Sequence, residues 1–467
     1  MTAAGDEALP PQRAQPGSLW RNQDFLRLWV GQTVSRVGSE VSLVAIPFTA
    51  VVVLGVDAFQ AGLLGTMEFL PFLLVGLPAG AVVDRMRRRR ILIAADAGRA
   101  LALGSVPLAA MTGHLSLLQL YAVALIAGVL TVFFDVAYQS YLPSLVEAGA
   151  LVDGNSKLEL SNSAAALSGP SIGGALVTLL GAPRAIAADA ASYVWSVAFL
   201  LLIRRREPEV ARSTVPRDQR TALRTEIAEG LRYVLGHRLL RPIAFCTGSW
   251  NLFGHIGFPV FVLFAVRDLG LGAGAVGVIF SVGAVGNLLG AAVCSRITGR
   301  IGIGRAVLYS QALTPSAFLI PLAVHDTAIP LLIAAGVLST FSGTIYNINQ
   351  VSLRQGITPR RLMGRLNATM RFIVWGTIPI GSLIGGILGT VIGLRATLVV
   401  SAAGQSLVFL WILLSPVPRV QRIEDHLHPE RVAELAAQAR GAGTVDGGVP
   451  ALPAGLGEEA ALPSARA

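Results

Sequence analysis

Several ionisable side chains lie inside long apolar segments, and they are the groups of this sequence best placed to do chemistry: Arg36, Glu40, Glu68, Asp96, Asp135 and Asp189. A charge at the centre of a bilayer costs about 3 kcal/mol, so such a residue marks a pathway or has a partner. Arg36 and Glu40 are four residues apart, on one face of a helix. They could form a neutralised structural pair or a proton or cation site. We expect Arg36, Glu40 and Glu68 to line a proton or substrate pathway.

The other three carboxylates suggest structural roles. Asp96 and Asp135 lie toward segment ends that carry basic loops, which favours gate or anchor roles. Asp189 is early in its segment, where packing against a neighbouring helix is the simpler interpretation.

The C-terminal half supplies no carboxylate for proton transfer, because no acidic residue occurs between Asp268 and Asp326 or between Asp326 and Glu424. Any proton-carrying carboxylate within the spans must therefore come from the N-terminal half. The C-terminal half instead offers amides, a histidine and aromatic rings, which suit a large amphipathic ligand: Asn251, His255, Asn287, Gln311, Asn347, Asn349 and Gln350, with Trp250, Phe253 and Phe258. Each amide could equally make a helix-to-helix hydrogen bond, and His255 could simply be packed.

These groups must be positioned by membrane helices. In 467 residues, 53% are apolar and only 14% are charged, so the apolar excess must face lipid. About twelve apolar runs are long enough to span a bilayer. They predict an all-α membrane protein with a tail (1–22), six spans (23–203), a polar linker (204–238), six more spans (239–415) and a second tail (416–467), both tails expected to be largely disordered. Two similar halves are typical of transporters that rock one bundle against the other.

The basic residues predict topology. All but Lys157 are arginines, and they cluster between apolar runs on alternate sides of the predicted membrane. Because cationic loops stay inside, we expect both termini in the cytoplasm and the protein in the cell membrane. Nucleic-acid binding would need basic residues on one face with interleaved aromatic rings, and that pattern is missing.

Cofactor chemistry finds no support in the sequence. Cys246 and Cys294 both lie in apolar runs and have no metal-ligand spacing. The segment from Gly272 to Gly277 matches a dinucleotide fingerprint, but it follows a span and has no acidic residue about 20 positions later. No phosphate-binding Gly-Lys-Ser/Thr loop occurs, and the few histidines are scattered. We therefore expect a protein that binds no cofactor and no metal and that is not an enzyme.

One basic loop carries a motif. Gly80, Asp84, Arg85, Arg88 and Arg89 match the G-x-x-x-D-R-x-G-R-R loop of the major facilitator superfamily, with Arg87 replacing its second glycine. The resemblance implies that Gly80 allows close helix approach and that Asp84 meets the positive end of the eleventh helix, so that this loop locks the cytoplasmic side. The alternative is a topology signal alone.

A second motif lies in the fifth predicted span. Gly169, Pro170, Gly173 and Gly174 resemble the core of the antiporter motif of the same superfamily, which implies a hinge and an export direction. Kinked packing is the alternative. Further segments resemble the enterobactin-exporter and macrolide-efflux subgroup, among them Asp24 to Trp29, Phe134 to Gln139 and Glu229 to Tyr233.

The resemblance implies the major facilitator fold and a monomeric secondary exporter in the lipid bilayer. Its cargo would be a small amphipathic molecule, a drug or siderophore-like metabolite, exchanged for protons. Proton-coupled uptake is the alternative within transport, and an embedded enzyme or a membrane sensor is the alternative from another class.

Overall fold

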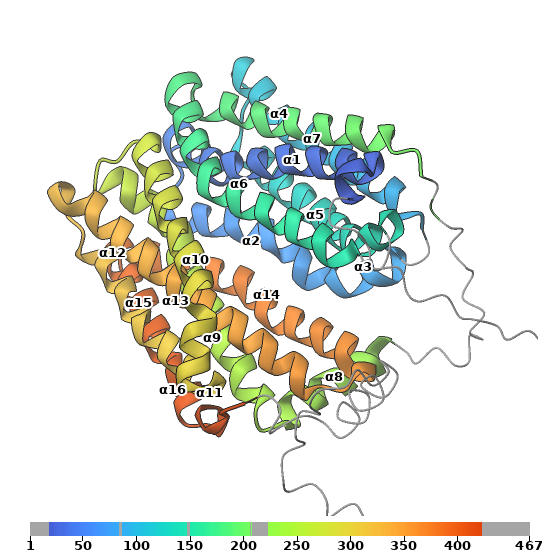
Figure 1. The fold of residues 1–467 in the computed structure, drawn as a ribbon. Coiled ribbons are helices and arrows are strands. Elements are labelled where there is room, and N and C mark those ends of the chain that lie inside the picture. The colour runs from blue at the N-terminus through green and yellow to red at the C-terminus, as the bar shows by residue number, and fades with distance from the viewer. Residues whose placement is uncertain (1–17, 84–85, 147–149, 206, 208–222, 423–467) are drawn as a thin grey trace, which may run out of the picture.

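The computed structural model describes residues 18–83, 86–146, 150–205, 207 and 223–422, and all regular structure in these residues is helical. Ten helices are long and apolar enough to cross a membrane within this described part. Two further passes are built from shorter helices, so the chain makes twelve passes. Figure 1 shows them as two bundles, one from each half of the sequence.

The N-terminal bundle contains six passes. Its elements are α1 (Gln23–Phe48) with a π-helical end (Thr49–Val53), α2 (Ala58–Leu74), α3 (Gly76–Val83), α4 (Arg88–Met111), α5 (Leu117–Leu145), α6 (Leu151–Leu180) and α7 (Ala182–Leu202). Asn22 caps α1 by accepting hydrogen bonds from the backbone N–H groups of Asp24 and Phe25, both at 3.1 Å.

The C-terminal bundle repeats this plan after the connecting helix α8 (Leu223–Gly236). Its elements are α9 (Leu240–Arg267), α10 (Ala273–Ile301), α11 (Ile303–Ser310), the 3-10 helix η5 (Gln311–Phe318), α12 (Leu319–Leu322), the 3-10 helix η6 (His325–Thr327), α13 (Ala328–Ile357), α14 (Arg360–Val391), α15 (Leu394–Leu407) and α16 (Phe409–Leu413).

Proline and glycine explain where the passes break and turn. The second pass is divided between α2 and α3, just after Pro71, and the ninth is divided by η5, which contains Pro315. Gly181 and Gly393 have φ near +85° and connect the last two passes of their bundles. Only glycine adopts this conformation without strain, and its recurrence at equivalent positions supports an internal repeat.

The bundles contact each other at one end, here called the distal end, which carries the loop around Gly55. There α2 packs on α14 and α6 on α10. The hydroxyl of Thr66 donates to the carbonyl of Pro379 at 3.2 Å, and Arg267 donates to the carbonyl of Val56 at 2.7 Å. One continuous buried apolar cluster includes residues of both bundles at this end. The distal end is therefore closed.

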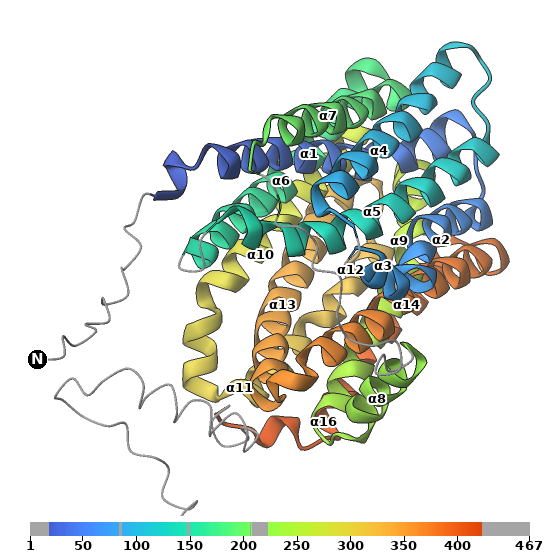
Figure 2. The same cartoon turned by 90° about the vertical axis from the view of Figure 1, so that its right-hand side faces the viewer.

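The opposite end, here called the linker end, carries α3 and α8 and lies to the right in Figure 1. Here each bundle has its own separate apolar cluster. A Cβ atom built on Gly76, Gly80 or Gly364 would meet no atom within 4 Å. Figure 2 shows α8 apart from α3. The bundles therefore diverge toward the linker end.

The ordered core extends slightly beyond the predicted bundle edges. Ser18–Arg21 forms a 3-10 turn with Leu19 buried, although the sequence predicted disorder up to residue 22. After residue 416, Val417 and Val420 are also buried, and the backbone N–H of Gly304 donates to the carbonyl of Val420 at 2.9 Å. Apolar burial orders both short segments.

Candidate functional site

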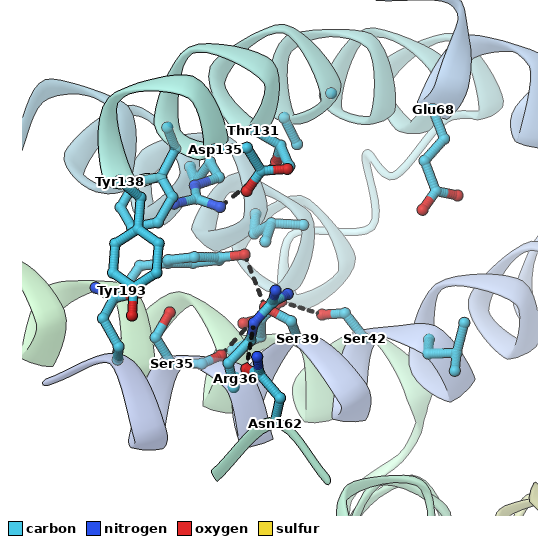
Figure 3. Close-up of a pocket in the computed structure, with 18 of the residues that line it drawn as sticks. Ser35, Arg36, Ser39, Ser42, Glu68, Thr131, Asp135, Tyr138, Asn162 and Tyr193 are labelled. Atoms are coloured by element: carbon cyan, nitrogen blue, oxygen red, sulfur yellow. Dashed lines mark hydrogen bonds between the residues drawn. The ribbon is translucent and has the colours of Figure 1, made fainter. Parts of the chain in front are cut away.

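The candidate site is a cavity between the two bundles, lined by α1, α2, α5 and α6 on one side and by α9, α10, α13 and α14 on the other. Arg36 lies where three of its compartments meet, and Figure 3 shows its side chain among polar groups of the N-terminal bundle. The structure therefore places the predicted pathway residue Arg36 at the centre of the molecule.

Arg36 and Glu40 share a helix face but form no ion pair within 4 Å among the described residues. The guanidinium of Arg36 instead donates from Nε to Oδ1 of Asn162 on α6 at 3.1 Å. Its charge still acts on Glu40 through space. Glu40 is thus half-buried, lines the cavity and is free to accept a partner.

Glu40 is held in place by a glycine of α6. A Cβ atom on Gly169 would collide with the Cβ of Glu40, so only glycine permits this approach of α6 to α1. Gly169 is the first residue of the predicted antiporter motif. That motif therefore contacts the predicted pathway directly.

The next glycines of the motif bring three helices together. Gly173 lies against the backbone of Val41 on α1, whereas Gly174 lies against Ala273 and Gly274 on α10 of the other bundle. The backbone N–H of Ser171, which follows Pro170, donates to the hydroxyl of Ser281 on α10 at 2.9 Å. The motif is therefore part of the closed contact between the bundles.

Two more carboxylates face the cavity from the N-terminal bundle. Glu68 projects from α2 and has no hydrogen-bond or ion-pair partner among the described residues; Figure 3 shows it apart from the Arg36 group. Asp135 on α5 lies within Coulombic reach of Arg36, Arg99 and Arg371, but forms no ion pair with any of them. Both carboxylates are available to a proton or a ligand.

A buried ionic network forms part of the cavity wall. Arg99 forms an ion pair with Asp96, which also accepts a hydrogen bond from Ser196 on α7 at 2.6 Å. The guanidinium is sandwiched between the rings of Phe134 and Tyr193, each centroid 4.3 Å away. The i, i+3 spacing of Asp96 and Arg99 was visible in the sequence. The sequence did not show that rings from α5 and α7 enclose Arg99.

Asp189 belongs to the same buried region. It is 1% exposed, and its carboxylate accepts hydrogen bonds from Ser42 at 2.5 Å and Ser192 at 3.2 Å. These contacts join α7 to α1, as the packing interpretation of Asp189 predicted.

The C-terminal wall supplies the predicted polar and aromatic groups. Asn251 donates a hydrogen bond to the carbonyl of Val374 at 2.9 Å. This is the helix-to-helix hydrogen bond that the sequence left open as the alternative to a ligand contact. Nδ1 of His255 bonds to the carbonyl of Asn251 at 3.0 Å, which leaves Nε2 free as an acceptor. Asn347 accepts a hydrogen bond from Gln350 at 3.0 Å and also lines the cavity.

Two cavity residues on α14 were not predicted from the sequence. Arg371 and Trp375 lie one helical turn apart, and the guanidinium of Arg371 lies 6.0 Å from the Trp375 ring. Arg371 also donates to Gln139 of the other bundle at 3.5 Å, and Trp375 packs on Phe72 with centroids 4.5 Å apart. An arginine inside an apolar segment was the signal that could have found them.

The predicted cytoplasmic gate is only partly described. Asp84 and Arg85 lie outside the described residues. Gly80 makes no close helix contact in this conformation, because the linker end is open. Arg89 donates to the carbonyls of Leu200 and Leu201, both at 2.9 Å, so it caps the C-terminus of α7 within its own bundle. The side chain of Arg88 is half-buried nearby.

The fold and the central cavity define a membrane transporter of the major facilitator type. A bacterial homologue of the iron transporter ferroportin has a similar structure in its inward-facing state, with a TM-score of 0.68, 17% identity and coverage of 85% of this chain and 98% of that chain. A TM-score of 0.55 relates this chain to the outward-facing state of a bacterial ferroportin homologue. The identity is 17%, and the match covers 84% of this chain and 98% of that chain. The shared architecture is that of twelve passes in two bundles.

Residues 15–446 match the model of the transmembrane secretion effector family, and the chain belongs to this family. It is 27% identical over 399 residues to the multidrug efflux pump Tap of Mycolicibacterium fortuitum, covering 83% of this chain and 94% of that protein. It is 29% identical over 387 residues to Tap of Mycobacterium tuberculosis H37Rv, covering 81% and 89%.

Proposed function

We propose that this protein exports small amphipathic molecules across the cell membrane by alternating access, in exchange for protons. The observation that carries the proposal is a cavity closed at the distal end and lined by three carboxylates without ion-pair partners, Glu40, Glu68 and Asp135. The similarity to Tap pumps supports efflux of small molecules.

The orientation follows from charge and conformation. The linker end carries the arginine-rich loops, so we assign this end, and with it both termini, to the cytoplasm. The greater similarity to an inward-facing than to an outward-facing transporter supports the same assignment. In this conformation the cavity would receive cargo from the cytoplasm.

Export requires the two interfaces at the distal end to separate. The contacts of α2 with α14 and of α6 with α10 would open, while the linker end closes around Gly80. Protons that enter from outside would bind to Glu40 and Glu68 and so break the interactions of these carboxylates with the cargo. The protein would then return to the conformation that is open at the linker end. The membrane potential contributes about 2.3 kcal/mol per charge for each 100 mV. The transporter would work as a monomer, since the site is complete within one chain.

The test is the direction of transport in everted membrane vesicles, measured with ethidium fluorescence. Energised vesicles that contain the protein should accumulate ethidium, and an ionophore that collapses the proton gradient should release it. Accumulation in right-side-out vesicles instead would replace export by uptake. The control variant is Asp153→Asn, which should transport ethidium like the wild-type protein. Asp153 pairs with Lys157 at 2.5 Å and does not line the cavity.

A further inference from the structure

An open groove of about 1170 Å³ lies at the linker end of the C-terminal bundle. It runs between the start of α9 and the last pass, which is built from α15 and α16, and none of its lining residues lines the central cavity. Figure 2 shows α16 and α8 at this same end of the bundle. Sites that enclose a drug-sized molecule are pockets of about 300–1000 Å³. This groove is larger, and most of its lining side chains are exposed, so it faces the surroundings of the bundle.

Three arginines line the groove. Arg238 lies in the turn before α9, Arg241 in the first turn of α9, and Arg419 in the short 3-10 helix η7 (Val417–Arg419). All three are exposed, and their guanidiniums form no hydrogen bond or ion pair within the described part of the chain. No described carboxylate lines the groove. The groove therefore presents three positive charges that the protein itself does not neutralise.

The rest of the groove is apolar. Leu407, Leu410, Trp411 and Leu414 follow the spacing of one helix face and are between 37% and 83% exposed. The ring of Trp411 packs on Phe245 of α9, with centroids 4.9 Å apart. The groove is thus amphipathic, with guanidiniums and an apolar helix face in one open site.

A hydrogen bond fixes the aromatic part of this surface. The indole Nε1 of Trp411 donates to the hydroxyl of Ser249 on α9 at 3.2 Å, so the ring joins the first and last passes of the bundle. Tryptophan is enriched where a membrane protein crosses the headgroup level of the bilayer. The position of Trp411 beside unpaired arginines therefore suits the boundary between lipid headgroups and acyl chains.

This combination matches a phospholipid with a net negative charge. Guanidinium groups bind phosphate oxygens through charge-assisted hydrogen bonds, and basic pockets between helices on the cytoplasmic side bind anionic headgroups. A zwitterionic headgroup would bring its own cation toward three guanidiniums. A small soluble anion would leave the apolar helix face uncovered.

We propose that this groove binds an anionic phospholipid of the cytoplasmic leaflet, with its phosphate at the three arginines and an acyl chain along the apolar face of α15 and α16. The bound lipid would connect the turn that enters the first pass of the C-terminal bundle to the segment that leaves its last pass. The inference goes beyond cargo export, and only the assignment to the cytoplasmic leaflet rests on the orientation proposed above.

The test is native mass spectrometry of the purified full chain in detergent, titrated with dioleoylphosphatidylglycerol or with dioleoylphosphatidylcholine, which has the same acyl chains. The wild-type protein should bind the first phosphatidylglycerol about tenfold more tightly than phosphatidylcholine. The triple variant Arg238→Gln, Arg241→Gln, Arg419→Gln should lose about tenfold or more in affinity for phosphatidylglycerol, because it lacks the groups that hold the phosphate.

A second triple variant is the matched control: Arg296→Gln, Arg300→Gln, Arg305→Gln. It removes the same charge from exposed arginines of α10 and α11 that do not line the groove, and it should bind phosphatidylglycerol like the wild-type protein. Inorganic phosphate at the concentration of the lipid should not displace it, because the acyl chain contributes to binding.

Equal affinity of the wild-type protein for the two lipids, or an equal loss in both triple variants, would overturn the proposal. Displacement by inorganic phosphate would assign the arginines to a soluble anion instead. A lipid-free dimer that the groove variant abolishes would assign the groove to a second copy of the chain. The measurement needs neither transport nor a defined orientation, so missing ethidium accumulation in everted vesicles would contradict the proposed export and leave the lipid site standing.

Discussion

The hydrogen bond between the bundles at Ser171 and Ser281 should control which end of the transporter is open. Ser281→Ala removes the hydroxyl that accepts a hydrogen bond from the Ser171 backbone N–H across the closed distal contact. Ser281 is 6% exposed, so water does not easily replace it. When the distal end opens, the N–H group becomes accessible to water. The substitution therefore destabilises only the distally closed state.

Losing such a bond across the contact costs about 0.5–1.5 kcal/mol. This changes the ratio of the two conformations by a factor of about 2–13 in favour of the distally open state. The bond spans two bundles, so its full energy enters the conformational equilibrium.

The assay is a spin-label distance measurement between Met86 and Arg238, two exposed positions at the linker end of opposite bundles. Ser281→Ala should increase the population with the shorter distance. Ser406→Ala is the control, because its hydroxyl bonds only within α15, to Ala402 at 2.7 Å. An unchanged distance distribution for Ser281→Ala would refute the proposed role of this contact.

Gly169→Ala should place a methyl group against Glu40 and lower the free energy of unfolding by about 1–3 kcal/mol. Thermal unfolding in detergent should therefore occur at a lower temperature, and ethidium efflux should fall. Normal efflux would show that this contact is unimportant. Arg99→Met should leave Asp96 buried and unpaired, which lowers the free energy of unfolding by about 3–5 kcal/mol. Adding Asp96→Asn should restore much of the thermal stability. No restoration would argue against the ion pair. Met86→Cys should react with an impermeant maleimide in everted vesicles and not in intact cells; the reverse pattern would invert the assigned topology.

The sequence predicted the architecture well because the bilayer constrains it strongly. Twelve apolar runs, a polar connection after the sixth and a repeated basic pattern predicted two six-pass bundles, and the structure confirms the all-helical fold. The break of the ninth pass at η5, which contains Pro315, was not predicted from the sequence. Which side chains share a cavity with η5 depends on how α9 and α13 pack beside it, and one sequence does not show this.

The candidate site was predictable only along single helices. The spacing of Arg36 and Glu40 predicted a shared face, but the partner of Arg36 is Asn162 on another helix. The rings around Arg99 come from α5 and α7, and Arg371 reaches Gln139 across the bundle interface. Such contacts depend on which helices are neighbours, and one sequence does not contain that information.

The most direct test of proton-coupled export at Glu40 is ethidium transport driven by a pH gradient in proteoliposomes of defined orientation. The wild-type protein and Asp153→Asn should accelerate ethidium movement out of the compartment that corresponds to the cytoplasm when the opposite side is acidified, whereas Glu40→Gln should fold normally and give no response to the gradient. An undiminished response of Glu40→Gln would contradict the account.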